Sequence, residues 1–249
     1  TNGYLSSSAQ YIQIKGGPHS GTFYSSDKGQ VNNLEYGGAS GSAVEFFMQK
    51  TAFGTGAPKP DKEIIFDLWN GFGTSSLSYG RFTIEIDKDA TDRFFVTYMS
   101  GTSGFARTPV PSTGGLSLVG QPWKYYSFGL DSSSAGNTID FYVNGVCFGP
   151  QIVTGSSIGR VTGSLVANIG GLRTSPSGSS YVSMVGSSEG WAKFSGSLDE
   201  FRFWNKNQTS QEIGRHWFSH VEGGTNKYSA NVDLGVYYKF NEGITGDAT

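Results

Sequence analysis

The segment 196–217, GSLDEFRFWNKNQTSQEIGRHW, decides the fold. It joins a charged, alternating strand to a short helix, in a chain that otherwise consists of short strands separated by glycine and serine. Thr209 and Glu212 form the T-x-x-E pattern of a capping box, and Ile213 and Trp217 follow at helical spacing. The segment therefore predicts one strand and then one short helix, which caps one end of a β-sandwich by burying Ile213 and Trp217.

The rest of the chain has the composition and spacing of an antiparallel β-sandwich. Thirty-seven of the 249 residues are glycines, and turn residues separate short alternating runs. Val44, Phe46 and Met48 alternate onto one strand face, and 81–101 predicts a hairpin with a polar tip. We expect an all-β jelly-roll sandwich of two antiparallel sheets, with one short helix near 209–220.

Length and charge exclude several classes of function. The 249 residues include 18 Lys and Arg and 20 Asp and Glu, with a formal net charge of −2 and no basic cluster to follow a phosphate backbone. The apolar runs are too short to span a membrane, and the single cysteine, Cys147, has no partner for an internal disulfide. We expect one domain over residues 1–249, part of a longer modular protein, with no nucleic-acid partner and no membrane insertion.

Three segments resemble a known family. The pattern of 196–213 is similar to laminin-G-like and pentraxin-like domains of the concanavalin A-like lectin/glucanase superfamily. The stretch 122–145, which ends in the turn Asn144-Gly145, resembles a hairpin of that family, and 234–243 resembles a strand found beside these domains. The resemblance implies a jelly roll. The chain's ending also resembles junctions in modular surface proteins of bacteria and tailed phages.

The family resemblance implies a non-catalytic recognition or adhesion module. Such a module would lie outside the cell or on a virion surface, with a glycan or neighbouring surface and virion proteins as its partners. Two alternatives stay open, because a fold does not fix a function. One is a structural virion or spacer domain that makes only protein contacts, and the other is a glycoside hydrolase.

The hydrolase alternative depends on three acids in one predicted strand. Glu85, Asp87 and Asp89 recur at every second residue, so they line one face. Retaining glycosidases of the superfamily use a similar motif, with two carboxyl groups about 5–5.5 Å apart. Here Asp89 stands where the motif has Glu, and the polar run 87–92 is also typical of a hairpin tip. Solvated hairpin acids are the simpler interpretation.

Aromatic side chains beside amide and carboxyl groups mark a candidate ligand surface. Rings can stack on the C–H faces of sugars, while Asn and Asp bond to sugar hydroxyls. The alternative for such rings is burial in the core. The candidate ligand-binding residues are Asp67, Trp69, Asn70, Phe72, Tyr125 and Tyr126.

Asp199 is the candidate metal ligand. On a regular strand Asp199, Phe201 and Phe203 share one face, and the phenylalanines must point to the core. A carboxylate in that row needs backbone donors or a cation such as Ca²⁺. Glu200 and Arg202 on the other face predict an outward ion pair.

Overall fold

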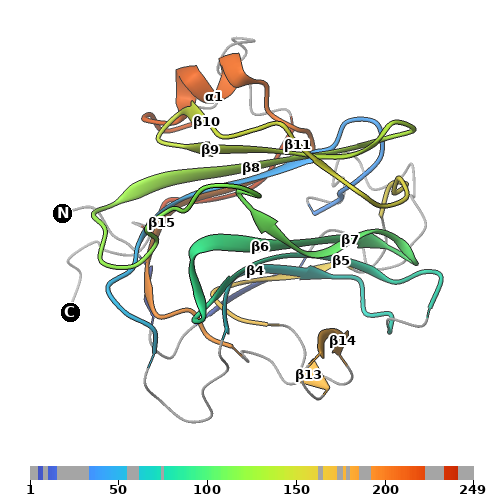
Figure 1. Ribbon diagram of the computed structural model, residues 1–249, viewed down its shortest axis with the longest axis horizontal. Helices are drawn as coiled ribbons and strands as arrows, with labels where there is room; N and C mark the ends of the chain where they lie inside the picture. The colour runs from blue at the N-terminus through green and yellow to red at the C-terminus, as the bar shows by residue number, and fades with distance from the viewer. Residues whose placement is uncertain are drawn as a thin grey trace, which may run out of the picture.

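The computed structural model has two stacked antiparallel sheets and one short helix on the outer side of the larger sheet (Figure 1). The predicted all-β sandwich is confirmed, and the described residues include one short helix, as expected. The structure describes residues 5–7, 11–15, 34–54, 62–73, 76–161, 165–172, 176–177, 180–184, 192–221 and 233–240.

The larger sheet has eight strands. Its main order is β1 (Leu5–Ser7), β15 (Gly196–Trp204), β3 (Ser42–Gln49), β8 (Lys124–Ser133), β9 (Gly136–Val143) and β10 (Val146–Cys147). Two further strands join it, β11 (Gln151–Val153) beside β9 and β16 (Leu234–Tyr238) beside β15. The segment that decided the fold thus supplies β15, which pairs with three other strands.

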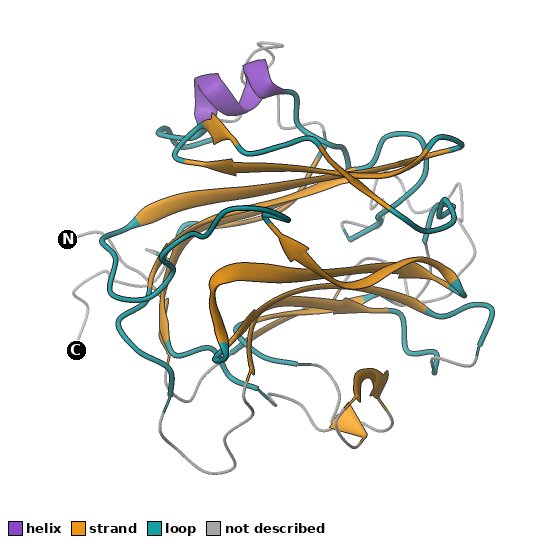
Figure 2. Cartoon of the chain, in the orientation of Figure 1, coloured by secondary structure: helices purple, strands orange, loops and turns teal. Residues whose placement is uncertain are grey.

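The smaller sheet has six strands, and its plane lies below the larger one in the view of Figure 2. Its order is β2 (Ile12–Lys15), β12 (Val166–Ile169), β4 (Lys62–Trp69), β5 (Gly80–Asp87), β6 (Ala90–Ser100) and β7 (Ser103–Val110). The predicted hairpin over 81–101 is β5 and β6. A separate pair, β13 (Pro176–Ser177) and β14 (Ser180–Met184), completes the strands.

The core lies between the two sheets and is rich in phenylalanine. The alternation expected for β3 places Val44, Phe46 and Met48 in it. Phe94 of the smaller sheet contacts the larger sheet edge-on, with its ring centroid 5.0 Å from that of Tyr126 and 5.1 Å from that of Phe128. Such aromatic pairs add about 0.5–1.5 kcal/mol each beyond the burial of their area.

A β-bulge in β15 corrects the predicted face of Asp199. The register pairs Asp199 with Phe47 and then Arg202 with Glu45, so β15 has one extra residue there. Glu200 takes a left-handed φ of 50° at this point. The shared row of Asp199 with the two phenylalanines is therefore wrong, since the bulge turns Asp199 to the outer face.

The helix α1 (Ser210–His216) packs on the outer face of the larger sheet, not at an end of the sandwich (Figure 1). Its predicted capping box is confirmed, because the Thr209 side chain and the Glu212 side chain each bond to the other's backbone N–H. Ile213 is buried, and the ring of Trp217 lies 6.1 Å from that of Tyr125. Within the described ranges, no helix is long and apolar enough to cross a membrane.

Arg202 ties α1 to the sheet beneath it. The guanidinium donates to the carbonyl oxygens of His216 at 3.3 Å and Ser219 at 2.5 Å, where the helix ends. It also pairs with Glu45 at 3.4 Å and Glu200 at 3.2 Å. The predicted pair of Glu200 and Arg202 exists, but it is buried and not outward, because the bulge and the helix enclose it.

Candidate functional site

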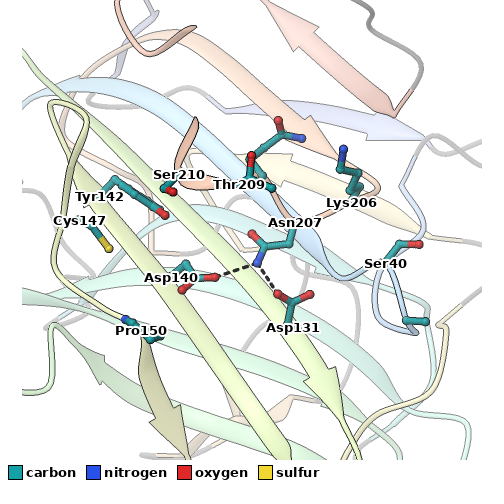
Figure 3. A pocket seen from close by; sticks show the side chains of 12 residues that line it. Ser40, Asp131, Asp140, Tyr142, Cys147, Pro150, Lys206, Asn207, Thr209 and Ser210 are labelled. Atoms are coloured by element: carbon teal, nitrogen blue, oxygen red, sulfur yellow. Dashed lines mark hydrogen bonds between the residues drawn. The ribbon is translucent and has the colours of Figure 1, made fainter. Parts of the chain in front are cut away.

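A cavity of about 630 Å³ opens beside the start of α1, on the outer face of the larger sheet. We call it the helix-side pocket and define it by Ser40, Asp131, Asp140, Tyr142, Lys206 and Asn207. Strands β8 and β9 form its floor, and the segment between β15 and α1 forms a wall (Figure 3). Its volume is that of ordinary small-ligand sites, which are about 300–1,000 Å³.

The alternation of β8 and β9 places two acids on the floor of this pocket. Leu130 and Ile139 point into the core, so the residues that follow them, Asp131 and Asp140, point outward. Asp140 lies opposite Gly129 in the register, which leaves open space on the outer face between the two acids. Both acid side chains are half-buried.

Asn207 reaches into that space and joins the two acids. Its Nδ2 donates to Oδ2 of Asp131 at 2.5 Å and to Oδ2 of Asp140 at 2.9 Å (Figure 3). Its backbone N–H donates to the carbonyl oxygen of Ser40 at 2.7 Å, which fixes the segment over the sheet. One amide therefore holds two carboxylates that would otherwise repel each other.

The floor of the pocket carries two acidic side chains, Asp131 and Asp140. Burial raises the pKa of Asp131, the hydrogen bond from Asn207 lowers it, and the charge of Asp140 raises it, with a net shift upward. Burial and the neighbouring Cys147 raise the pKa of Tyr142 to about 12, so its hydroxyl keeps its proton at neutral pH. The pocket can therefore accept hydrogen bonds at two charged groups and holds a neutral phenol beside them.

The predicted ligand residues of β4 lie on the other sheet. Asp67 is fully buried and accepts hydrogen bonds from Arg81 at 2.8 and 2.6 Å and from Thr83 at 2.9 Å. Trp69 is half-buried, and its indole N–H donates to the carbonyl oxygen of Phe72 at 2.8 Å. These contacts give the acid and the ring structural roles, and their part in binding stays a prediction.

Asn70 follows β4 and fixes the shape of the connection from β4 to β5. The Asn70 amide donates to the carbonyl oxygen of Ser78 at 2.7 Å and accepts from the N–H of Gly80 at 3.0 Å. Phe72 is half exposed, at 50%. Of the candidate residues within 69–72, Phe72 is therefore the most exposed, and its part in binding stays a prediction.

The two predicted tyrosines point in opposite directions from β8. Tyr126 lies in the core and Tyr125 lies under α1, and each is 1% exposed. The structure therefore does not bring either ring together with Asp67 and its neighbours on the smaller sheet. A contact between either ring and a ligand stays a prediction.

The acids of the hydrolase motif are held by an arginine. Arg107 donates to Oε1 of Glu85 at 2.6 Å and to Oδ2 of Asp87 at 3.0 Å. Burial raises the pKa of Glu85, while the Arg107 charge lowers it. Asp89 is exposed in the hairpin tip, where its N–H donates to Asp87 at 3.0 Å. The interpretation as solvated hairpin acids holds for Asp89 and is wrong for Glu85, which is 2% exposed within β5.

Asp199 has a backbone partner, the N–H of Glu200, at 2.9 Å from its Oδ1. Ca²⁺ takes six to eight oxygen ligands. Over the described part of the chain, no three His, Cys, Asp or Glu residues gather as a metal site would need. Calcium at Asp199 stays a prediction, and a melting curve with and without a chelator tests it.

Asp131, Asp140 and Asn207 are pocket residues that the sequence did not single out. A signal for Asp140 exists, because the alternation of 137–143 points it away from the core, together with Tyr142. Asn207 has no such signal, since its position depends on how the segment after β15 folds back over β8.

Comparison with known proteins supports the fold. No family model and no curated protein matches the chain. A candidate carbohydrate-binding protein from Bacteroides ovatus matches 97% of this chain with a TM-score of 0.52 and 17% identity. The similarity shows that the two-sheet antiparallel β-sandwich of this chain is a known fold. It spans 51% of the length of that protein.

Two other solved structures are similar at lower scores. The heptameric SAP-like pentraxin from Limulus polyphemus matches over 82% of each chain, with a TM-score of 0.43 and 12% identity. Mouse laminin α1 domains LG4-5 match over 85% of this chain and 47% of that one, with a TM-score of 0.44 and 10% identity. These similarities concern the fold alone.

Proposed function

We propose that this chain is a non-catalytic carbohydrate-recognition module whose ligand binds in the helix-side pocket. The observation that carries the proposal is the Asn207 amide, which holds Asp131 and Asp140 side by side on the floor of an open cavity. Paired acceptors of this kind suit the hydroxyl groups of a sugar. The described function of the similar Bacteroides ovatus protein adds support.

The contacts of the acids favour binding over hydrolysis. A glycosidase needs one carboxyl group to deliver a proton and another to attack the sugar or activate water, with the bond to be cleaved between them. In the helix-side pocket the Asn207 amide fills the space between Asp131 and Asp140. On the smaller sheet, the Arg107 guanidinium bridges Glu85 and Asp87.

The wider setting that we propose is adhesion. The module would act outside the cell or on a virion surface, as part of a larger protein, with calcium at Asp199 as an additional stabilising ligand. Its partners would be glycans or neighbouring surface proteins, and neither nucleic acid nor membrane insertion is part of this proposal.

A structural spacer domain is the second candidate. Val146, Phe148 and Phe218 are 61%, 47% and 67% exposed. Phe218 lies on the α1 side, where its ring is 5.6 Å from that of Trp217. Val146 and Phe148 lie at the β10 edge, where Val146 pairs with Val143 and the ring of Phe148 lies 6.0 Å from that of Phe141. Large apolar side chains exposed at a sheet edge and beside a helix can serve as protein contacts.

A glycan array followed by calorimetry tests the first candidate. The glycan that binds best is titrated into the parent protein, Asp140→Ala and, as a matched control, Asp89→Ala on the other sheet. We expect Asp140→Ala to weaken binding by about ten- to a hundred-fold, because a hydrogen bond to a charged group is lost, and Asp89→Ala to bind normally. An array without hits, together with a stable protein complex, would favour the spacer. Glycan turnover that Glu85→Gln abolishes would establish the hydrolase instead.

A further inference from the structure

The amide donor of the helix-side pocket is already engaged. Nδ2 of Asn207 carries two hydrogens, and both acids of the floor accept from it. Asp131 and Asp140 each use one oxygen in these bonds, so each carboxylate keeps further lone pairs. What the floor offers to a ligand is therefore acceptors.

The cation at the rim is engaged as well. The Lys206 ammonium lies 3.0 Å from Oε1 of Glu212 and 4.0 Å from Oδ2 of Asp233. The hydroxyl of Thr209 donates to Glu212 at 2.8 Å. Since Glu212 offsets the charge of Lys206, the field inside the pocket is set by the two acids of the floor and is negative.

We infer that the helix-side pocket selects neutral glycans that present adjacent hydroxyl groups, and that it rejects acidic glycans. This inference rests on the proposed function and names the ligand class of the same site. Each hydroxyl of a neutral sugar can donate to Asp131 or Asp140. A sugar carboxylate or sulfate would lie next to the negative charges of Asp131 and Asp140. Lys206 would not offset this repulsion, because it is paired with Glu212. The repulsion would make the pocket selective for neutral glycans.

Matched glycan pairs test the inference. Each pair presents one neutral glycan with and without a terminal sialic acid, uronic acid or sulfate, and the affinities are measured with the unmodified protein. We expect the neutral member to bind at least about tenfold more tightly. Raising the salt from about 0.05 to 0.5 M should narrow the difference, because salt screens the repulsion of half-buried acids from a mobile ligand.

The variant Asp140→Asn separates charge from structure. It keeps the size of the side chain and removes one negative charge. We therefore expect the affinity for the neutral glycan to fall, and the affinity for the acidic glycan to rise relative to that for the neutral one. Asp89→Asn, which removes a charge on the other sheet, should leave the ratio unchanged. If Asp140→Asn lowers the affinity for the neutral and the acidic glycan by the same factor, the selection does not depend on the charge of Asp140, and the inference is contradicted.

The outcomes distinguish this inference from the proposed function. Acidic glycans that bind as tightly as their neutral partners, or more tightly, would overturn the inference and leave a carbohydrate-recognition module standing. Failure of every glycan to bind would overturn both.

Discussion

Gly129 and Asn207 are in direct contact on the outer face of the larger sheet. A Cβ atom added to Gly129 would lie 1.9 Å from Oδ1 of Asn207, so only glycine leaves room for the amide at this position. The register places Gly129 opposite Asp140, and the amide that lies over the glycine is thereby brought between the two acids. The pocket thus depends on a residue with no side chain.

The substitution Gly129→Ala tests this contact. The added methyl group must displace Asn207, and we expect a loss of about 1–3 kcal/mol in the free energy of unfolding, with glycan affinity reduced at least about tenfold. Gly159→Ala is the control, because nothing lies within 4 Å of a Cβ there. Urea unfolding and calorimetry provide the two readouts. Normal glycan binding by Gly129→Ala would show that binding does not require the Asn207 amide between Asp131 and Asp140.

The substitution Asn207→Asp tests whether the Asn207 amide stabilises the two acids. A third carboxylate would face Asp131 and Asp140 without a donor between them. We expect the melting temperature to fall by several degrees at pH 7, and the difference from the parent protein to shrink at pH 4, where protonation relieves the repulsion. An equal difference at both pH values would show that the loss is not electrostatic.

Binding should depend on pH through Asp131. Its pKa is raised by burial and by Asp140, so the carboxyl group takes up a proton at a higher pH than an ordinary aspartate, whose pKa is about 3.9. The charged form is the better acceptor, and glycan affinity should therefore fall as the pH drops through this raised pKa. Asp131→Asn should bind more weakly and show a flatter pH profile. Circular dichroism at each pH checks that the fold persists.

Arg202 should contribute strongly to stability. Arg202→Ala leaves the buried Glu45 without its partner and releases the carbonyl oxygens at the end of α1. We expect a cost of about 3–5 kcal/mol in urea unfolding. The matched control is Arg93→Ala, which removes the solvent-exposed ion pair with Asp92 and should cost much less than Arg202→Ala. Similar costs for the two variants would mean that the buried network does not hold the helix.

The regular elements of this fold could be predicted because each depends on local sequence. The alternation of Val44, Phe46 and Met48 gave β3, and the pairing of Thr209 with Glu212 gave the start of α1. In each case the residues that determine the element lie within it or directly beside it in the sequence. Local periodicity is sufficient there.

The irregular features could not be predicted, because they depend on residues far apart in sequence. Nothing near Glu200 signals the bulge, which shifts Asp199 to the outer face of β15. The pocket requires Asn207 to meet Asp131 and Asp140, which precede it by more than sixty residues. Local patterns singled out Asp67 and Trp69 of β4 and, as an alternative, Glu85 and Asp87 of β5. In the structure Arg81 and Arg107 bind these acids.

The free thiol of Cys147 offers the most direct test of the pocket as the glycan site. Cys147 is exposed and lines the pocket, and among the described residues it is the thiol that an alkylating reagent can reach. The rate of its alkylation is measured with and without a saturating concentration of the bound glycan. The account predicts that the glycan slows alkylation several-fold. An unchanged rate, under conditions where calorimetry shows the glycan bound, would place the binding site elsewhere.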